Sequence, residues 1–150
     1  MKTMEYHTVD KSTWPDGPWK KEYDKVQYTD PATGMPCLIV RGPSGALCGY
    51  VGVDEKHPFY KKSYEEVPVD AHGGLTYSAH CTEGEHGICH IPEEGEPDNV
   101  WWLGYDCAHL GDLCPAHHGF GSFGYEATYK DMDYVKEGNA DLARQLVALK

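Results

Sequence analysis

The sequence has no long hydrophobic run. Its apolar stretches, such as Cys37 to Val40, are far too short to cross a bilayer. The first ten residues are polar and lack the hydrophobic segment that a signal peptide requires. These two absences lead us to expect a soluble cytoplasmic protein that makes no membrane contact.

Basic residues are also scarce. The chain has 13 lysines and arginines against 24 aspartates and glutamates, so its formal net charge is −11. Direct nucleic-acid binding is therefore not expected, because phosphate backbones bind to basic surfaces. The negative net charge is explained by its effect on solubility, and it is also compatible with a basic protein partner.

Several well-known catalytic fingerprints are missing. The chain has no Walker loop, no G-x-S-x-G elbow, no H-E-x-x-H motif and no dinucleotide-binding glycine pattern. Its six cysteines could form three disulfides in a secreted protein. Without an export signal we instead expect reduced cysteines, some ligating a metal and others, such as Cys37 and Cys48, packed in the core.

The length and composition fit one globular domain, since the chain has 150 residues of which 40% are hydrophobic. A Gly-Pro-Ser-Gly turn between two β-rich runs predicts a hairpin over 36–53. Near-continuous apolar character predicts a further, buried strand over 100–106. Residues 1–30 are polar and poorly periodic, so we expect them to form a partly ordered arm.

A helix is predicted over 129–148. Val135, Leu142 and Leu146 fall at helical spacing along one face. Thr128, followed three residues later by Asp131, resembles a capping box with Thr128 as the N-cap. The expected fold is therefore an α+β domain, with an antiparallel β-sheet and a long C-terminal helix packed on it.

Histidine and cysteine concentrate in residues 72–118. This stretch holds seven of the nine histidines and four of the six cysteines. Imidazole and thiolate are the ligand types that zinc prefers. We therefore expect the chemistry of the protein to lie in this stretch, and two constellations can be separated within it.

The first constellation predicts a zinc site. Its spacing, Cys-x4-His-x2-Cys-His, lets a tight turn present several ligands to one ion, with a distant cysteine completing the set. The metal candidates are Cys81, His86, Cys89, His90 and Cys107, with Cys114 as a substitute for the last. The alternative interpretation is a set of buried thiols and hydrogen-bonded histidines.

The second constellation predicts a catalytic pocket formed by His72, Asp106, His109 and Asp112. These groups could bind a metal that activates water, or pair as an oriented general base without metal. The alternative is a His/Asp network that only stabilises loops. A pocket of this kind could use Tyr77, Trp101 and Trp102 as a stacking wall, and Cys107 beside His109 is a less favoured nucleophile.

Three motifs carry a resemblance. They are H-G-G-L-T-Y from His72, G-I-C-H-I-P-E from Gly87 and W-W-L-G-Y-D-C-A-H-L-G-D from Trp101. Together they resemble a family of small uncharacterised proteins of tailed phages and prophages, over about two thirds of the chain. The resemblance implies that the shared pattern includes Cys89, His90, Asp106, Cys107, His109 and Asp112. The shared pattern leaves out Cys114, His117 and His118, which are therefore less favoured as metal ligands.

The resemblance implies an accessory protein, and such proteins often counter host defence. We therefore expect the His/Asp pocket to bind a small anionic or nucleotide-like ligand, with hydrolysis of that ligand as one outcome. One alternative is a non-enzymatic acidic inhibitor of a basic host protein. The other is a protein in which zinc has only a structural role.

Overall fold

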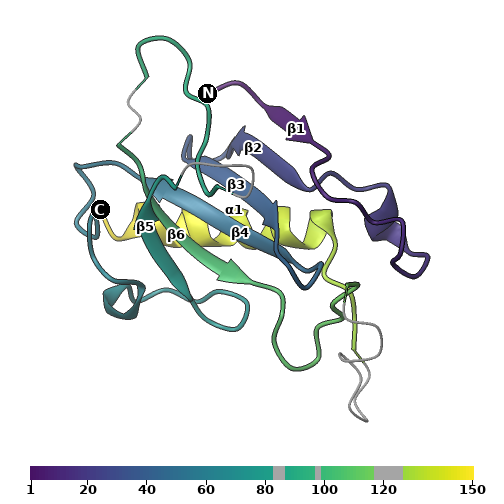
Figure 1. The fold of residues 1–150 in the computed structure, drawn as a ribbon. Coiled ribbons are helices and arrows are strands. Elements are labelled where there is room, and N and C mark those ends of the chain that lie inside the picture. The colour runs from purple at the N-terminus through teal and green to yellow at the C-terminus, as the bar shows by residue number, and fades with distance from the viewer. Residues whose placement is uncertain (83–86, 97–98, 117–126) are drawn as a thin grey trace.

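The fold was analysed in a computed structural model, which describes residues 1–82, 87–96, 99–116 and 127–150. One antiparallel sheet has the strand order β1-β2-β3-β4-β6-β5 (Figure 1). Its strands are β1 (Met4–Tyr6), β2 (Lys25–Thr29), β3 (Pro36–Arg41), β4 (Leu47–Val53), β5 (Tyr77–His80) and β6 (Trp101–Asp106). Two short 3₁₀ helices lie in the connections, η1 (Pro18–Lys20) and η2 (Tyr64–Glu66).

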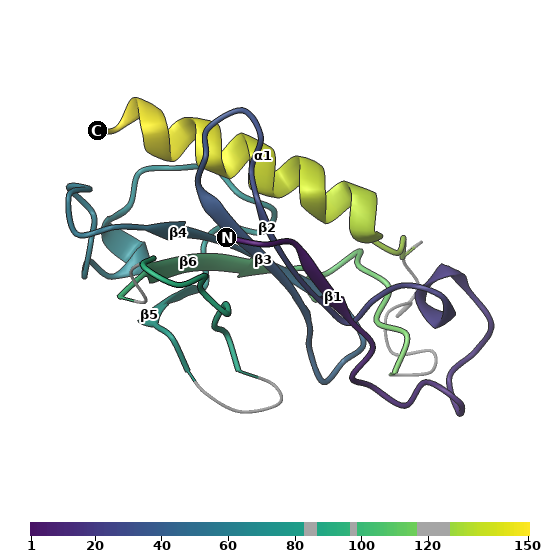
Figure 2. The same ribbon diagram turned by 90° about the horizontal axis from the view of Figure 1, so that it is seen from above.

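The helix α1 (Met132–Ala148) crosses one face of this sheet, as Figure 2 shows from above. Val135, Leu142 and Leu146 are fully buried against β3 and β4, so the predicted leucine stripe is confirmed as the packing face. The antiparallel sheet and the C-terminal helix confirm the expected α+β class.

The predicted start of the helix is wrong. The N-cap is Asp131, whose carboxylate accepts a hydrogen bond from the backbone N–H of Tyr134 at 2.9 Å. Thr128 lies outside the helix because its backbone pairs with Asp112 in an isolated parallel bridge. Its carbonyl accepts from the N–H of Leu113, whereas the carbonyl of Asp131 accepts the first helical hydrogen bond, from Val135.

Strands β3 and β4 form the hairpin that was expected over 36–53, with Cys37 opposite Val51. Strand β6 lies between β4 and β5 and is buried on both faces, as its composition predicts. Leu103 and Tyr105 contribute to the core beneath α1, while Trp102 belongs to a second cluster on the opposite face. The sheet therefore separates two apolar layers. The C-terminal end of β6 lies toward the side of the sheet on which α1 begins (Figure 1).

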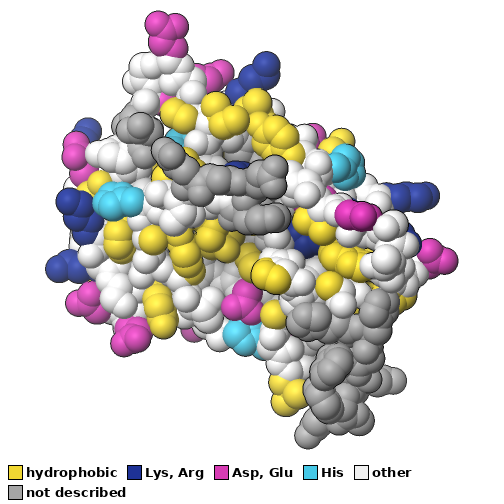
Figure 3. Space-filling view, viewed as in Figure 1, with side chains coloured by type: hydrophobic (Ala, Val, Ile, Leu, Met, Phe, Trp, Pro, Cys, Tyr) yellow, Lys and Arg dark blue, Asp and Glu magenta, His cyan; other side chains and the backbone are white. Residues whose placement is uncertain are grey.

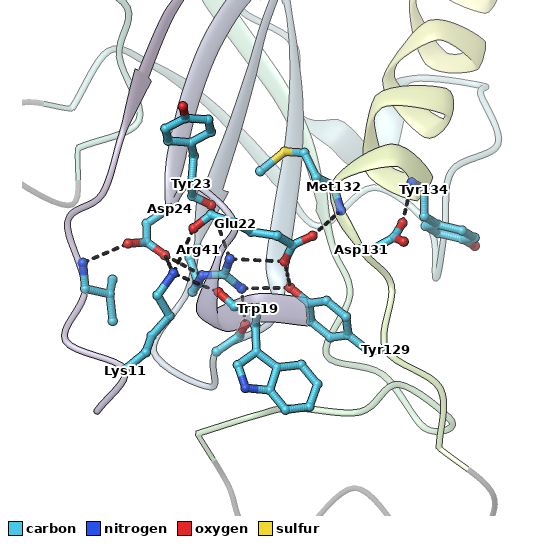
Figure 4. A network of polar contacts seen from close by, with 12 residues as sticks. Lys11, Trp19, Glu22, Tyr23, Asp24, Arg41, Tyr129, Asp131, Met132 and Tyr134 are labelled. Atoms are coloured by element: carbon cyan, nitrogen blue, oxygen red, sulfur yellow. Dashed lines mark hydrogen bonds and ion pairs between the residues drawn. The ribbon is translucent and has the colours of Figure 1, made fainter. Parts of the chain in front are cut away.

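Residues 1–30 are more ordered than predicted, since they supply β1 and β2. A buried polar network, drawn in Figure 4, anchors them. The Asp24 carboxylate lies 2.7 Å from Nε of Arg41 and 2.9 Å from Nζ of Lys11, and all three side chains are almost fully buried. Glu22 extends the network to α1, because its carboxylate accepts from the N–H of Met132. Charged side chains therefore stabilise this region in place of the apolar periodicity that sequence reasoning looks for.

Candidate functional site

The predicted catalytic residues lie where β6 ends and α1 begins. The loop after η2 runs along α1 toward the same place. The Gln145 side chain, near the end of α1, hydrogen-bonds both the N–H and the carbonyl of Asp70, and His72 reaches Tyr134 in the first turn. His72 follows in this loop, and His109 and Asp112 follow β6. We use the term His72 site for His72, Asp106, His109, Asp112 and Tyr134.

His72 makes a hydrogen bond with each ring nitrogen. Its Nε2 lies 2.7 Å from Oδ2 of Asp112, and its Nδ1 lies 2.8 Å from the hydroxyl of Tyr134. An ionised carboxylate can only accept, so Nε2 carries the proton. In the neutral imidazole Nδ1 is then an acceptor, and it receives the hydrogen bond of the Tyr134 hydroxyl.

Asp112 is the buried anchor of the site, with only 3% of its surface exposed. Burial opposes its ionisation, but hydrogen bonds from His72, the N–H of His109 and Nζ of Lys130 outweigh burial. The pKa of this carboxyl consequently lies below its ordinary value. Asp112 therefore holds His72 in one orientation and one tautomer.

His109 and Asp106 form a second pair beside the first. Nε2 of His109 lies 3.2 Å from Oδ1 of Asp106, although its alignment makes no hydrogen bond among the described residues. The His109 ring lies so close to Gly73 that a Cβ there would come within 2.3 Å of it. The two imidazoles have their centroids 6.0 Å apart. The structure thus brings all four predicted catalytic residues into one region, as two adjoining His/Asp pairs.

A cavity of about 330 Å³ opens beside this region, and its wall includes His72 and Tyr134. Three carboxylates also border it, from Asp70, Glu137 and Asp141. The Asp141 carboxylate is engaged by Arg144 and Gln145 of the same helix. The charged residues that line the cavity are therefore acidic.

The His72 site is not arranged as a preformed metal centre. In the described part of the chain, three ligand atoms of the required types come within 4.8 Å of one another only at Cys81, Cys89 and His90. The geometry instead matches the metal-free alternative, an imidazole oriented by a carboxylate. Such a pair can accept a proton at Nδ1 of His72 while Asp112 stabilises the resulting cation.

The predicted metal ligands are only partly brought together. We name Cys81, Cys89 and His90 the Cys81 cluster; it lies where the chain leaves β5 and returns toward β6. His86 falls outside the described residues. Cys107 follows the opposite end of β6, buried beneath α1, so the structure does not place it with the cluster.

The expectation that all cysteines are reduced is wrong for two of them, because Cys81 and Cys89 form a disulfide. Their Cα atoms lie 4.5 Å apart, since Thr82 and Ile88 join the two arms of the loop through backbone and side-chain hydrogen bonds. Cys37 is free and fully buried in the core, as predicted. A Cys/His cluster with metal-ligand chemistry therefore exists, with its two sulfurs joined.

The other predicted contributors lie elsewhere. Burial raises the pKa of Cys107 to about 12, which leaves it protonated and argues against a nucleophilic role. Trp101 and Trp102 begin β6, whereas Asp106 ends it, so these rings do not form a wall of the His72 site. Trp102 is fully buried in the cluster on the opposite face of the sheet. The histidines His117 and His118 lie outside the described residues.

Tyr134 is the residue of the site that sequence reasoning missed. It lies in the first turn of α1, and 40% of its surface is exposed. The helical period places Tyr134 off the leucine stripe and toward solvent, whichever residue caps the helix. The pairing with His72 has no sequence signal, because the two residues are 62 positions apart.

No helix in the described residues is long and apolar enough to span a membrane. Comparison with protein-family models, curated proteins and solved structures found no match to this chain.

Proposed function

We propose that the chain is an accessory protein of the tailed-phage type. It binds a small molecule at the His72 site, and His72 accepts a proton there as a general base. The observation that supports this proposal is the bridge made by His72, between the buried Asp112 carboxylate and the exposed Tyr134 hydroxyl on the wall of a cavity. The hydrogen bonds at the two ring nitrogens hold the imidazole of His72 in place before a ligand binds, so little free energy is spent on reorienting it.

The proton would come from a bound hydroxyl or water molecule. This group would accept a hydrogen bond from the Tyr134 hydroxyl and give its own proton to Nδ1 of His72, the ring nitrogen that faces Tyr134. Asp112 would stabilise the imidazolium through the 2.7 Å bond to Nε2. Hydrolysis is the reaction class that this base supports when the group it deprotonates is water.

The acidic residues that line the cavity restrict the kind of anionic or nucleotide-like ligand that can bind in it. Carboxylates of Asp70, Glu137 and Asp141 border the cavity. Lys130, 3.2 Å from Asp112, is already engaged. A free phosphate would be repelled here, so we propose that the nucleoside part of a nucleotide-like ligand, or an amine, enters and that any phosphate stays outside.

The test is a binding panel of nucleosides, nucleotides and polyamines, measured by calorimetry with the full chain. A ligand that binds should lose about tenfold in affinity in Tyr134→Phe, the equivalent of one hydrogen bond of about 1.4 kcal/mol. The matched control is Tyr23→Phe, because Tyr23 is similarly exposed, at 36%, and its hydroxyl is remote from the site. Unchanged affinity in Tyr134→Phe, or no binding by any member of the panel, would contradict the proposal.

A basic host protein is the other partner that the net charge suggested. Association through charge alone would require a surface patch of one sign. On the face opposite α1, shown in Figure 3, acidic and basic side chains are interspersed along the edge, and hydrophobic side chains gather toward the middle. This distribution gives the inhibitor hypothesis no specific support on that face.

A second proposed function is zinc binding at the Cys81 cluster. The proximity of three ligand atoms within 4.8 Å favours it, since zinc takes thiolate and imidazole ligands in this combination. Metal analysis of reduced protein purified without a histidine tag tests it, with one zinc per chain as the expected result.

A further inference from the structure

We infer that the oxidation state of Cys81 and Cys89 decides whether the Cys81 cluster holds a metal, so that disulfide and zinc exclude each other. This inference rests on the proposed zinc site and adds its regulation. It starts from two facts, that the same two sulfurs form the disulfide and that they belong to the three-ligand group with His90.

The exclusion follows from coordination geometry. A tetrahedral zinc with Zn–S bonds of about 2.3 Å keeps its two sulfurs about 3.8 Å apart, so they cannot be bonded to each other at the same time. Zinc also requires thiolates, and disulfide sulfurs carry no such charge. The oxidised cluster therefore retains one strong ligand, His90, which is too few to hold the ion.

The reduction step balances with a phosphine as the reductant. The phosphine transfers two electrons to the S–S bond and becomes a phosphine oxide with the oxygen of one water molecule. The two protons of that water go to the sulfurs of Cys81 and Cys89. Zinc binding then displaces both thiol protons to solvent, so metal affinity should rise with pH.

One buried indole contacts two members of the Cys81 cluster. The indole N–H of Trp102 donates to Sγ of Cys81 at 3.4 Å, and this indole is fully buried. A donor aimed at sulfur stabilises the negative charge that metal binding needs. The Trp102 ring also packs edge-on against His90, with centroids 5.5 Å apart, so one buried ring contacts two of the three ligands.

Three protein ligands leave one coordination position of a tetrahedral ion for water or for another donor. The cluster lies at the start of β6, whereas Asp106 of the His72 site follows at its end. The metal would therefore lie apart from the proton-transfer centre.

The experiment uses Co²⁺ as the probe, because thiolate ligation gives it a charge-transfer band in the near ultraviolet. The full chain is titrated in two forms, oxidised and phosphine-reduced. The four free cysteines, Cys37, Cys48, Cys107 and Cys114, are thiols in both forms and serve as an internal control. We expect one Co²⁺ per reduced chain, displaced by Zn²⁺, and at least 100-fold weaker binding to the oxidised chain.

Two variants locate the site. Cys89→Ser should abolish the band in the reduced protein, and Cys48→Ser, which alters a free and half-buried cysteine, should leave it unchanged. Equal Co²⁺ affinity in both redox forms would overturn the redox control alone. Absence of binding in both forms, or a band that survives in Cys89→Ser, would overturn the zinc site itself. The two failures are therefore distinguishable.

Discussion

Replacing Arg41 with methionine should be among the most damaging single changes outside the apolar core. Methionine keeps much of the length and volume of the side chain but removes its charge and all its donors. In the native protein Nε of Arg41 donates to Asp24 at 2.7 Å, and Nη1 of Arg41 donates to the Gly45 carbonyl and the Tyr129 hydroxyl at 2.9 Å each. The side chains of Arg41 and Asp24 are both completely buried, so the Asp24 carboxylate has no contact with solvent that could replace the lost donor.

The expected loss in the free energy of unfolding follows from the Asp24 carboxylate, which stays buried without its arginine partner. Removing one partner of a buried ion pair costs about 3–5 kcal/mol, because the other partner stays buried without compensation. Lys11 still lies 2.9 Å from Asp24, so we expect the lower end, about 3 kcal/mol. This is a large share of the 5–15 kcal/mol that typically stabilises a domain. For this chain length it corresponds to a decrease in Tm of about 6–12 °C.

The assay is urea unfolding followed by circular dichroism, together with a thermal scan. Arg144→Met is the matched control, since Arg144 also pairs with an aspartate, Asp141, but its side chain is 73% exposed. Exposed pairs contribute about 0–1 kcal/mol, so the control should remain close to the native protein. If Arg41→Met and Arg144→Met lose equal stability, the buried network does not anchor residues 1–30 in the way that we describe.

Three further predictions concern the candidate site. Gly73→Ala should lower the free energy of unfolding by about 1–3 kcal/mol more than Gly74→Ala in urea titrations, because both glycines have positive φ but only Gly73 contacts His109; equal losses would refute the contact. The pKa of Asp112 is lower in the folded than in the unfolded chain, so the unfolded state binds more protons in acid. The contribution of this carboxyl to the free energy of unfolding is complete above its unfolded pKa of about 3.9. It should be lost as the pH falls through the folded pKa. Urea midpoints between pH 6 and 3 should accordingly fall less steeply in Asp112→Asn, and parallel slopes would count against this role. Cys107, whose burial raises its pKa to about 12, should resist iodoacetamide at pH 8 in the folded protein and react in urea, as mass spectrometry of the peptides would show; rapid labelling of the native chain would contradict its burial.

The parts of the fold that follow hydrophobic periodicity were predictable. The leucine stripe of α1 follows the helical period. The hairpin of β3 and β4 and the doubly buried β6 follow from near-continuous apolar runs of strand length. Strands β1 and β2 could not be recognised in this way. Residue Asp24, next to β2, is buried through ion pairs with Lys11 and Arg41, and such pairs leave no periodic signal in the local sequence.

The candidate site, too, was predictable only in part. The residue types indicated which side chains could do chemistry. The pairing of His72 with Asp112 instead of Asp106, and the entry of Tyr134 into the site, depend on the turn after β6 and on the angle at which α1 begins. The disulfide of Cys81 with Cys89 likewise depends on how the loop after β5 closes.

By itself, the sequence of this protein determined its elements of regular structure where apolar residues repeat, and it determined the stretch in which the reactive side chains lie. Only the tertiary structure decided which of those side chains meet. The physical reason is that hydrogen bonds and ion pairs act over about 3 Å, so their partners are chosen by the packing of segments far apart in the chain and not by the composition of any one segment.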